Sequence, residues 1–145
     1  MAEKLAGYSE RPLAQKLGIK AGARIVVIDP PANYRKLLGG SGRNMQFAHR
    51  AGADLSFIHY FATRRSELEK QLALLRQKLA DTGTLWVSWP KKSAGVATDV
   101  TEDVIRAVAL PLGFVDIKVC AVDETWSGLK LMIRLENRKS ASPKR

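Results

Sequence analysis

The sequence predicts a three-layer α/β domain whose mostly parallel sheet ends in an antiparallel hairpin. Segments typical of strands and of helices alternate along most of the chain, and such strand–helix units build parallel sheets through right-handed crossovers. The segment 84–89 shows little alternation between apolar and polar residues, which is typical of a strand covered on both faces. The last two strand candidates, 114–122 and 129–135, have no helix between them, so we expect them to pair as a hairpin.

The composition is that of one globular domain with an unusual positive charge. The chain has 145 residues, 46% of them hydrophobic, and a formal net charge of +10. A chain of this length buries roughly 68–70% of its unfolded surface, enough for a core without disulfides. Basic proteins attract nucleic acids without specific contacts, so nonspecific nucleic-acid binding is one expectation. No helix-turn-helix, zinc-finger or RNA-recognition signature accompanies the charge.

Part of this charge lies at the C-terminal end. From position 134 onward the basic residues outnumber the single acid, Glu136; they are Arg134, Arg138, Lys139, Lys144 and Arg145. We predict a single α/β domain over 1–135, followed by a basic, disordered tail over 136–145. The tail is either a solvated end or a nonspecific contact for nucleic acid.

The single cysteine excludes an internal disulfide. Cys120 lies in an apolar segment, 117–122, which favours a packed thiol over a nucleophile. The chain shows neither a leader pattern nor an apolar run near the ~20 residues that a membrane span needs. We therefore expect a cytoplasmic protein.

The first half of the chain predicts two short helices and three strands. Leu13 and Leu17 would form the buried stripe of the first helix, with Ser9 as its cap. The strand candidates are 24–28, a brief 44–48 and the strong 54–61, and the second short helix is 33–38.

The clearest helix follows the strand 54–61. Thr63 or Ser66 would cap it, and Ser66 and Glu69 have the spacing of a capping box. Its apolar residues fall on one stripe that would face the sheet; they are Leu68, Leu72, Leu75 and Leu79. Gly83 would close this helix before the strand 84–89.

A second long helix precedes the hairpin. Thr98 and Asp99 are expected to cap it, and Pro111 and Gly113 to end it. Its apolar side would carry Val104, Ile105, Val108 and Leu112.

This order of elements resembles the fold of the S-adenosylmethionine-dependent methyltransferases. The segment 17–24 is similar to the lead-in to their first strand, and 79–85 is similar to the turn before their penultimate core strand. The resemblance covers most of the chain and rests on order and turns. It implies a shortened Rossmann-like, methyltransferase-like fold.

The residues that would hold the cofactor in that family do not match. The family pattern places an acid and then glycines at the end of the first strand, where this chain has Val27 and then Asp29, Pro30 and Pro31. Proline lacks the backbone N–H that such a loop offers a ligand. The brief second strand lacks the acid that holds the cofactor ribose, and only 49–53 separates it from the next strand, which leaves no room for a further strand–helix unit. We predict no cofactor and no S-adenosylmethionine binding.

Two segments resemble a family of short bacterial proteins of unknown function. They are Ser-Trp-Pro-Lys-Lys at 88–92, with the residues that follow it to Asp103, and Asp-Glu-Thr-Trp-Ser-Gly at 123–128. The opening 12–18 matches as well. This resemblance carries no activity, cofactor or catalytic residue.

The sequence predicts one cleft at the edge of the sheet where the parallel strands end, because ligands of open α/β sheets bind there. If the strand from Phe114 runs parallel to the others, the segment 123–127 reaches that edge as well. The candidate ligand-binding residues are Asp29, Tyr60, Trp89, Lys91, Lys92, Ser93, Asp123, Glu124 and Trp126. No catalytic residue can be named: there is no Gly-x-Ser-x-Gly elbow, and no Cys–His cluster indicates a metal site.

Each of these residues has a structural interpretation beside the functional one. Lys91 and Lys92 would bind an anion near the start of the second long helix, or pair with Asp123 or Glu124 and hold two loops together. The tryptophans Trp89 and Trp126 would stack on a flat ligand or pack their loops.

The ring residues at the end of the strand 54–61 also have a functional and a structural interpretation. His59 and Tyr60 would titrate or donate at the cleft, or fill the core.

Three functional hypotheses follow. The first is a noncatalytic binding or interaction module, with a protein partner or small ligand, on a methyltransferase-like scaffold that has lost its cofactor loop. The second is an enzyme that binds a small anionic ligand between Asp29, Lys91, Lys92 and Asp123. The third is nonspecific nucleic-acid binding. No membrane partner is expected.

Overall fold

A mixed six-stranded sheet in the order β2-β1-β3-β4-β6-β5 forms the middle layer of the protein. The structure, a computed structural model, describes residues 12–19, 24–38, 46–48 and 54–138. The strands are β1 (Arg24–Ile28), β2 (Gln46–Ala48), β3 (Leu55–Phe61), β4 (Leu79–Pro90), β5 (Phe114–Ala121) and β6 (Trp126–Ile133). Strands β2, β1, β3 and β4 are parallel, while β6 runs antiparallel to both β4 and β5.

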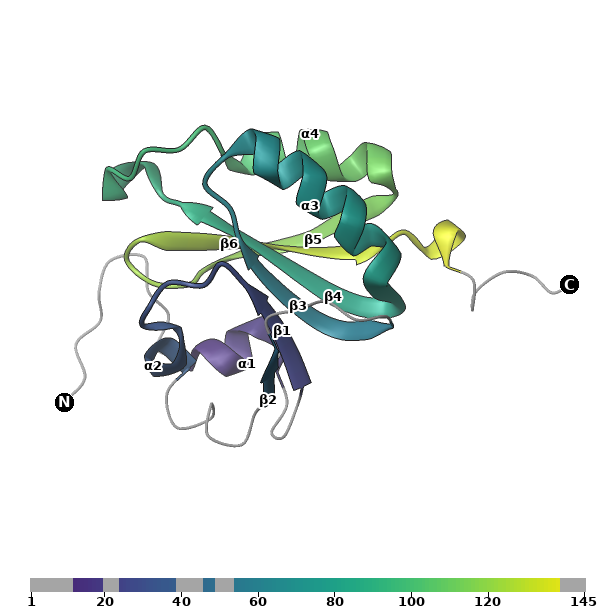
Figure 1. The fold of residues 1–145 in the computed structure, drawn as a ribbon, viewed down its shortest axis with the longest axis horizontal. Helices are drawn as coiled ribbons and strands as arrows, with labels where there is room; N and C mark the ends of the chain where they lie inside the picture. The colour runs from purple at the N-terminus through teal and green to yellow at the C-terminus, as the bar shows by residue number, and fades with distance from the viewer. Residues whose placement is uncertain (1–11, 20–23, 39–45, 49–53, 139–145) are drawn as a thin grey trace, which may run out of the picture.

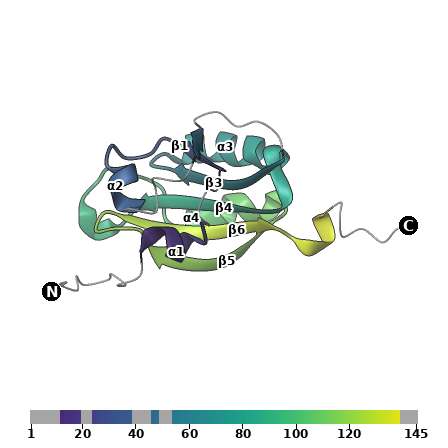
Figure 2. The same ribbon diagram turned by 90° about the horizontal axis from the view of Figure 1, so that it is seen from below.

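Helices cover both faces of this sheet, which confirms the predicted three-layer α/β class (Figure 1). Helices α3 (Arg65–Lys78) and α4 (Glu102–Ala109) lie on one face. The short helices α1 (Leu13–Leu17) and α2 (Tyr34–Leu38) lie on the other, as Figure 2 shows from below. The two faces carry separate buried clusters of side chains, so residues alternate between two cores along each central strand.

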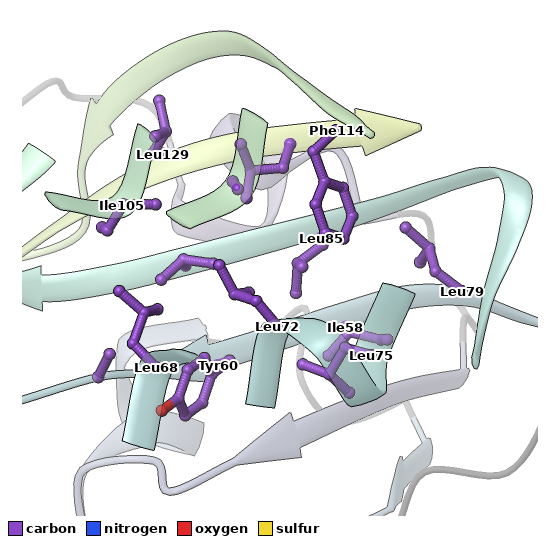
Figure 3. Packing of buried hydrophobic residues seen from close by; sticks show 14 of the residues in the cluster. Ile58, Tyr60, Leu68, Leu72, Leu75, Leu79, Leu85, Ile105, Phe114 and Leu129 are labelled. Carbon is purple, nitrogen blue, oxygen red and sulfur yellow. The ribbon is translucent and has the colours of Figure 1, made fainter. Parts of the chain in front are cut away.

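The larger core lies under α3 and α4 (Figure 3). Leu68, Leu72 and Leu75 are fully buried against the sheet, which confirms the predicted stripe. Leu79 is buried too, but it already belongs to β4, so the prediction that α3 continues to Gly83 is wrong. Gly83 instead lies within β4, where an added Cβ would be 2.7 Å from the carbonyl oxygen of Leu55, a contact that only glycine avoids.

The start of α3 is capped from a distant loop. Either Thr63 or Ser66 was expected to cap this helix, but the residue at its N-cap is Arg64, which makes no side-chain cap bond. The backbone N–H of Arg65 donates to Asp99 Oδ1 at 2.7 Å, so Asp99 supplies the oxygen that a local cap would supply.

The loop after β4 is thereby tied to the end of β3. The Thr98 hydroxyl donates to the carbonyl of Thr63 at 2.7 Å, beside the Asp99 bond. The expectation that Thr98 and Asp99 cap the second long helix is therefore wrong. Thr101 does so, because its side chain accepts a hydrogen bond from the Val104 N–H.

Strand β6 lies between β4 and β5, so the terminal hairpin joins the sheet through its second strand. The Arg106 guanidinium binds Asp116 at 2.7 Å and ties α4 to β5. A short 3-10 turn at Leu135–Asn137 follows β6, and Arg138 Nε donates to the carbonyl of Ile133. The rest of the predicted tail and the predicted cap Ser9 lie outside the described residues, and within those residues no helix is long and apolar enough to span a membrane.

Candidate functional site

The carboxyl ends of β1, β3, β4 and β5 meet at one edge of the sheet. Since β5 is antiparallel to β6 and β6 is antiparallel to β4, β5 runs in the direction of the central strands. The condition that would bring 123–127 to this edge is therefore met. The loops after β1 and β4 and the β5–β6 turn all leave the sheet here (Figure 1).

Two of these loops are joined through their backbones. The Lys91 N–H donates to the carbonyl of Thr125 at 2.7 Å, which places the start of the loop after β4 against the β5–β6 turn. The buried Asp123 holds that turn from inside, because its Oδ1 accepts the N–H groups of Thr125 at 2.8 Å and Trp126 at 2.7 Å. Asp123 thus acts on its own turn, as Asp commonly does.

The two lysines of this loop are not neutralised by acids. In the part of the chain that the structure describes, neither Lys91 nor Lys92 forms the expected ion pair with Asp123 or Glu124. Lys91 is half-buried, while Lys92 and Ser93 are exposed on a 3-10 turn, Lys92–Ala94. Glu124 is exposed as well. The interpretation in which ion pairs hold the loops together is therefore wrong: a backbone hydrogen bond does so.

The two tryptophans lie on opposite faces of the sheet. Trp89 belongs to the core under α3 and α4, whereas Trp126 packs against the core under α1 and α2. The strand pairing is consistent with this placement. Trp89 pairs with Ser127 and Trp126 with Pro90, so the two tryptophans are one position apart in the register and point to opposite faces. They cannot stack on the two sides of one flat ligand, and the expectation that both meet around one cleft is wrong.

A chain of buried polar side chains crosses the sheet under α2. The Tyr34 hydroxyl lies 2.9 Å from His59 Nδ1, and His59 Nε2 lies 2.8 Å from Ser88 Oγ. Because a neutral imidazole carries one N–H, one of these bonds runs into the ring and the other out of it. Both ring nitrogens of the fully buried His59 are thereby satisfied.

Aromatic rings and a glycine close this network. His59 stacks on Phe61 with ring centroids 4.3 Å apart, and Phe61 meets Trp126 edge-on at 5.0 Å. Gly128 lies against the network, where an added Cβ would be 3.3 Å from Ser88 Oγ and 3.2 Å from the Trp86 ring. The network is part of the core, and burial lowers the pKa of His59 to about 3, so the ring is neutral at physiological pH.

The structure thus answers the open question about His59: it is a core residue. Its partners Tyr34 and Ser88 were not predicted from the sequence. The pairing of β3 with β4 explains why Ser88 lies near His59. Because His59 pairs with Trp86 and Phe61 with Ser88 in parallel strands, all four side chains lie on the same face of the sheet.

Tyr60, the next residue of β3, faces the other core. It pairs with Ile28 at the end of β1, directly before Asp29, and only 1% of its surface is exposed. Its hydroxyl makes no hydrogen bond with any residue of the described ranges. Burial raises the pKa of Tyr60, and the charges of Asp29 and Glu67 raise it further, which places both acids near the ring.

Asp29 takes the backbone conformation that the loop after β1 needs. Its φ is 54°, in the left-handed region that favours glycine and that Asp and Asn tolerate best among other residues. Glu67 lies in the first turn of α3 and was not among the predicted site residues. An acid in the first turn of a helix is already explained by its favourable interaction with the helix dipole, so the sequence gives no sign of a further role.

The candidate residues therefore form separate groups along one edge. Asp29 and Tyr60 lie with Glu67 beside α3, Lys91, Lys92 and Ser93 start the loop after β4, and Asp123 and Glu124 belong to the β5–β6 turn. Among the described residues no group of three or more His, Cys, Asp or Glu side chains could hold a metal ion.

Comparison with solved structures identifies the fold. A SAM-dependent methyltransferase from Aquifex aeolicus is similar with a TM-score of 0.60 and 14% identity, over 84% of this chain and 88% of that chain. A putative type 11 methyltransferase from Sulfolobus solfataricus gives a TM-score of 0.58 and 13% identity, over 84% and 89%. A TehB-like SAM-dependent methyltransferase from Corynebacterium glutamicum gives 0.51 and 11%, over 89% and 91%. No family model and no curated protein matches the sequence. The chain therefore has a methyltransferase-like α/β fold.

The two buried tyrosines provide a test of the network. We expect Tyr34→Phe to lower the free energy of unfolding by about 1–3 kcal/mol, because it leaves a ring nitrogen of His59 buried without a partner. Tyr60→Phe loses no hydrogen bond with a described residue and should change this free energy by less than about 0.5 kcal/mol. Urea unfolding of the two variants measures both values, and equal losses would contradict the assignment.

The neutral state of His59 predicts a loss of stability in mild acid. The pKa is about 3 in the folded protein, against roughly 6.5 for a free histidine. The contribution of His59 to the free energy of unfolding is therefore fully present well above pH 6.5. Below that pH the unfolded chain alone takes up the proton, and this free energy falls by about 1.4 kcal/mol per pH unit down to pH 3. We expect unfolding free energies at pH 6.5 and pH 5 to differ by about 2 kcal/mol more in the native sequence than in His59→Gln. Parallel pH profiles for the two proteins would show that the ring is protonated in the fold.

Proposed function

We propose that this protein is a noncatalytic binding module on a methyltransferase-like scaffold without a usable S-adenosylmethionine site. The observation that carries the proposal is the segment after β1. Asp29 keeps a glycine-like φ of 54°, but Pro30 and Pro31 follow it without backbone N–H donors. The resemblance to methyltransferases predicts that a cofactor would need donors at this point.

The helix that follows this loop supports the same conclusion. Tyr34 begins α2, is buried on the sheet, and is held there by its bond to His59 of β3. Its ring also meets Phe61 edge-on at a centroid distance of 5.5 Å. The segment that would wrap around a cofactor is therefore packed into the core by its own tyrosine, and moving it would leave buried polar atoms unpaired.

The far edge of the sheet supports it as well. In the described part of the chain β2 is the outermost strand on this side and has three residues, with β1 as its neighbour. The methyltransferase pattern adds another strand–helix unit beyond it, and the five residues 49–53 that separate β2 from the start of the β3 segment are too few for one. Without that strand–helix unit, this side of the sheet lacks the residues that would pack against the adenine.

A thermal-shift titration with S-adenosylmethionine and S-adenosylhomocysteine tests this proposal. We expect no change in Tm up to millimolar ligand, whereas a methyltransferase of this fold, measured beside it, is stabilised. A site that is filled at 100 times its Kd stabilises by about 2.7 kcal/mol, which is roughly 5–10 °C for a chain of this size. A rise of that order would overturn the proposal.

An enzyme that binds a small anionic ligand is the alternative, and one observation favours it. Lys91 and Lys92 lie at the carboxyl edge of the sheet without an acidic partner among the described residues, and Ser93 follows them in the same turn. Asp123, the buried acid of the β5–β6 turn, is occupied by backbone N–H groups. Uncompensated lysines at the ligand edge of an α/β sheet are suited to phosphate or carboxylate groups.

Pyrophosphate is a suitable probe of this alternative. If the lysines bind anions, millimolar pyrophosphate should stabilise the native protein, and Lys91→Gln/Lys92→Gln should lose that stabilisation. The matched control is Lys118→Gln/Lys130→Gln, a pair of lysines opposite one another on β5 and β6 that lowers the net charge equally. Equal loss in both double variants would indicate nonspecific attraction by the charge of +10.

A further inference from the structure

The Tyr60 hydroxyl is a polar group at the end of a buried side chain without a hydrogen-bond partner. In the described residues every fully buried side-chain nitrogen or oxygen atom has a partner. The Tyr60 oxygen has none, although the residue is 99% buried, so this oxygen must keep a small opening to solvent. In Figure 3 it lies beside Leu68, at the start of α3. The side chain therefore presents its hydroxyl at the carboxyl edge of the sheet.

Two acidic side chains flank this hydroxyl from different elements. Asp29 directly follows Ile28, the register partner of Tyr60, and Glu67 precedes Leu68, which packs in the same cluster as Tyr60. Both acids are exposed, and neither makes an ion pair or hydrogen bond with a described residue. The closest arginine in sequence, Arg65, is turned to Glu69 at 3.1 Å. The Tyr60 hydroxyl and two acids from neighbouring elements thus lie at the same part of the edge, and within the described residues none of them has a positively charged partner.

The chemistry of these oxygen atoms selects the class of ligand. A phosphate or carboxylate would be repelled by the two acids. A transition metal would need more ligands than this edge offers, since no metal-binding cluster occurs among the described residues. A primary ammonium group has three N–H donors and one positive charge, which matches two carboxylates and one hydroxyl oxygen.

We propose that Asp29, Tyr60 and Glu67 form a subsite for the protonated primary amine of a small ligand. This inference rests on the proposed binding function and names the chemistry of one part of its ligand. The net charge of +10 repels polycations at long range, so the ligand carries a single ammonium group on a body that is neutral or negative elsewhere.

An NMR titration with n-butylamine tests the subsite, with n-butanol as the neutral molecule of equal length. We expect saturable chemical-shift changes at Asp29, Tyr60 and Glu67 with butylamine, with a Kd in the millimolar range, and none with butanol. Asp29→Asn and Glu67→Gln should each weaken binding at least fivefold, and Tyr60→Phe at least twofold. Equal changes with butanol, or no saturable change at these residues, would overturn the proposal.

Asp103→Asn is the matched control for the two acids. Asp103 lies in the first turn of α4, as Glu67 does in α3, and its side chain is 98% exposed. The variant should bind butylamine as the native protein does; equal weakening in Asp103→Asn would reduce the effect to overall charge and overturn the subsite.

The two proposals fail in different experiments. Butylamine binding together with a thermal shift by S-adenosylmethionine would leave the amine subsite standing and reject the loss of the cofactor site. Absence of butylamine binding without any cofactor shift would reject the subsite alone.

Discussion

The chain of hydrogen bonds from Tyr34 through His59 to Ser88 is the constraint on which this edge of the molecule depends. It joins α2, β3 and β4 inside one core, and Gly128 of β6 gives it room. Every polar atom in it must stay paired, because an unpaired buried donor or acceptor costs about 1–3 kcal/mol. The network therefore fixes where the segment after β1 can lie, and with it the shape of the edge where the fold places ligands.

A site-forming loop and a core network make opposite demands on the same residues. A loop that binds a cofactor must present backbone donors to a ligand, whereas here Pro30 and Pro31 have none and Tyr34 turns inward. Asp29 nevertheless retains a φ of 54°, the backbone bend of a glycine position. The loop after β1 thus combines a glycine-like bend with two residues that have no backbone N–H to offer.

The fold could be predicted from sequence because local patterns determine it. The leucine stripe of α3, the apolar β4 and the two adjacent final strands each point to one arrangement, and the structure contains all of them. Predictions that depend on distant partners failed. Nothing near Arg65 shows that Asp99, 34 residues later, caps α3, and nothing near Lys91 shows that Asp123 is occupied by its own turn.

The site shows the same division between local and distant information. The edge at which the strands end follows from the order of strands and helices, so Asp29 and Tyr60 were placed there correctly. The face of each residue was not predicted, because a shift of one residue in register moves every side chain of a strand to the other side. Trp89 and Trp126 were therefore expected together but lie on opposite faces.

That division by face also decides which groups can act on one ligand. Because side chains alternate along β3, His59 lies in the hydrogen-bonded network with Tyr34 and Ser88, whereas the next residue, Tyr60, lies in the core under α3. On the side of α1 and α2, the buried side chains of Tyr34, His59 and Ser88 are hydrogen-bonded to one another. On the side of α3, a hydroxyl and two acids lack partners among the described residues. Of the two adjacent ring residues His59 and Tyr60, the one whose polar group lacks a partner among the described residues therefore lies on the face under α3.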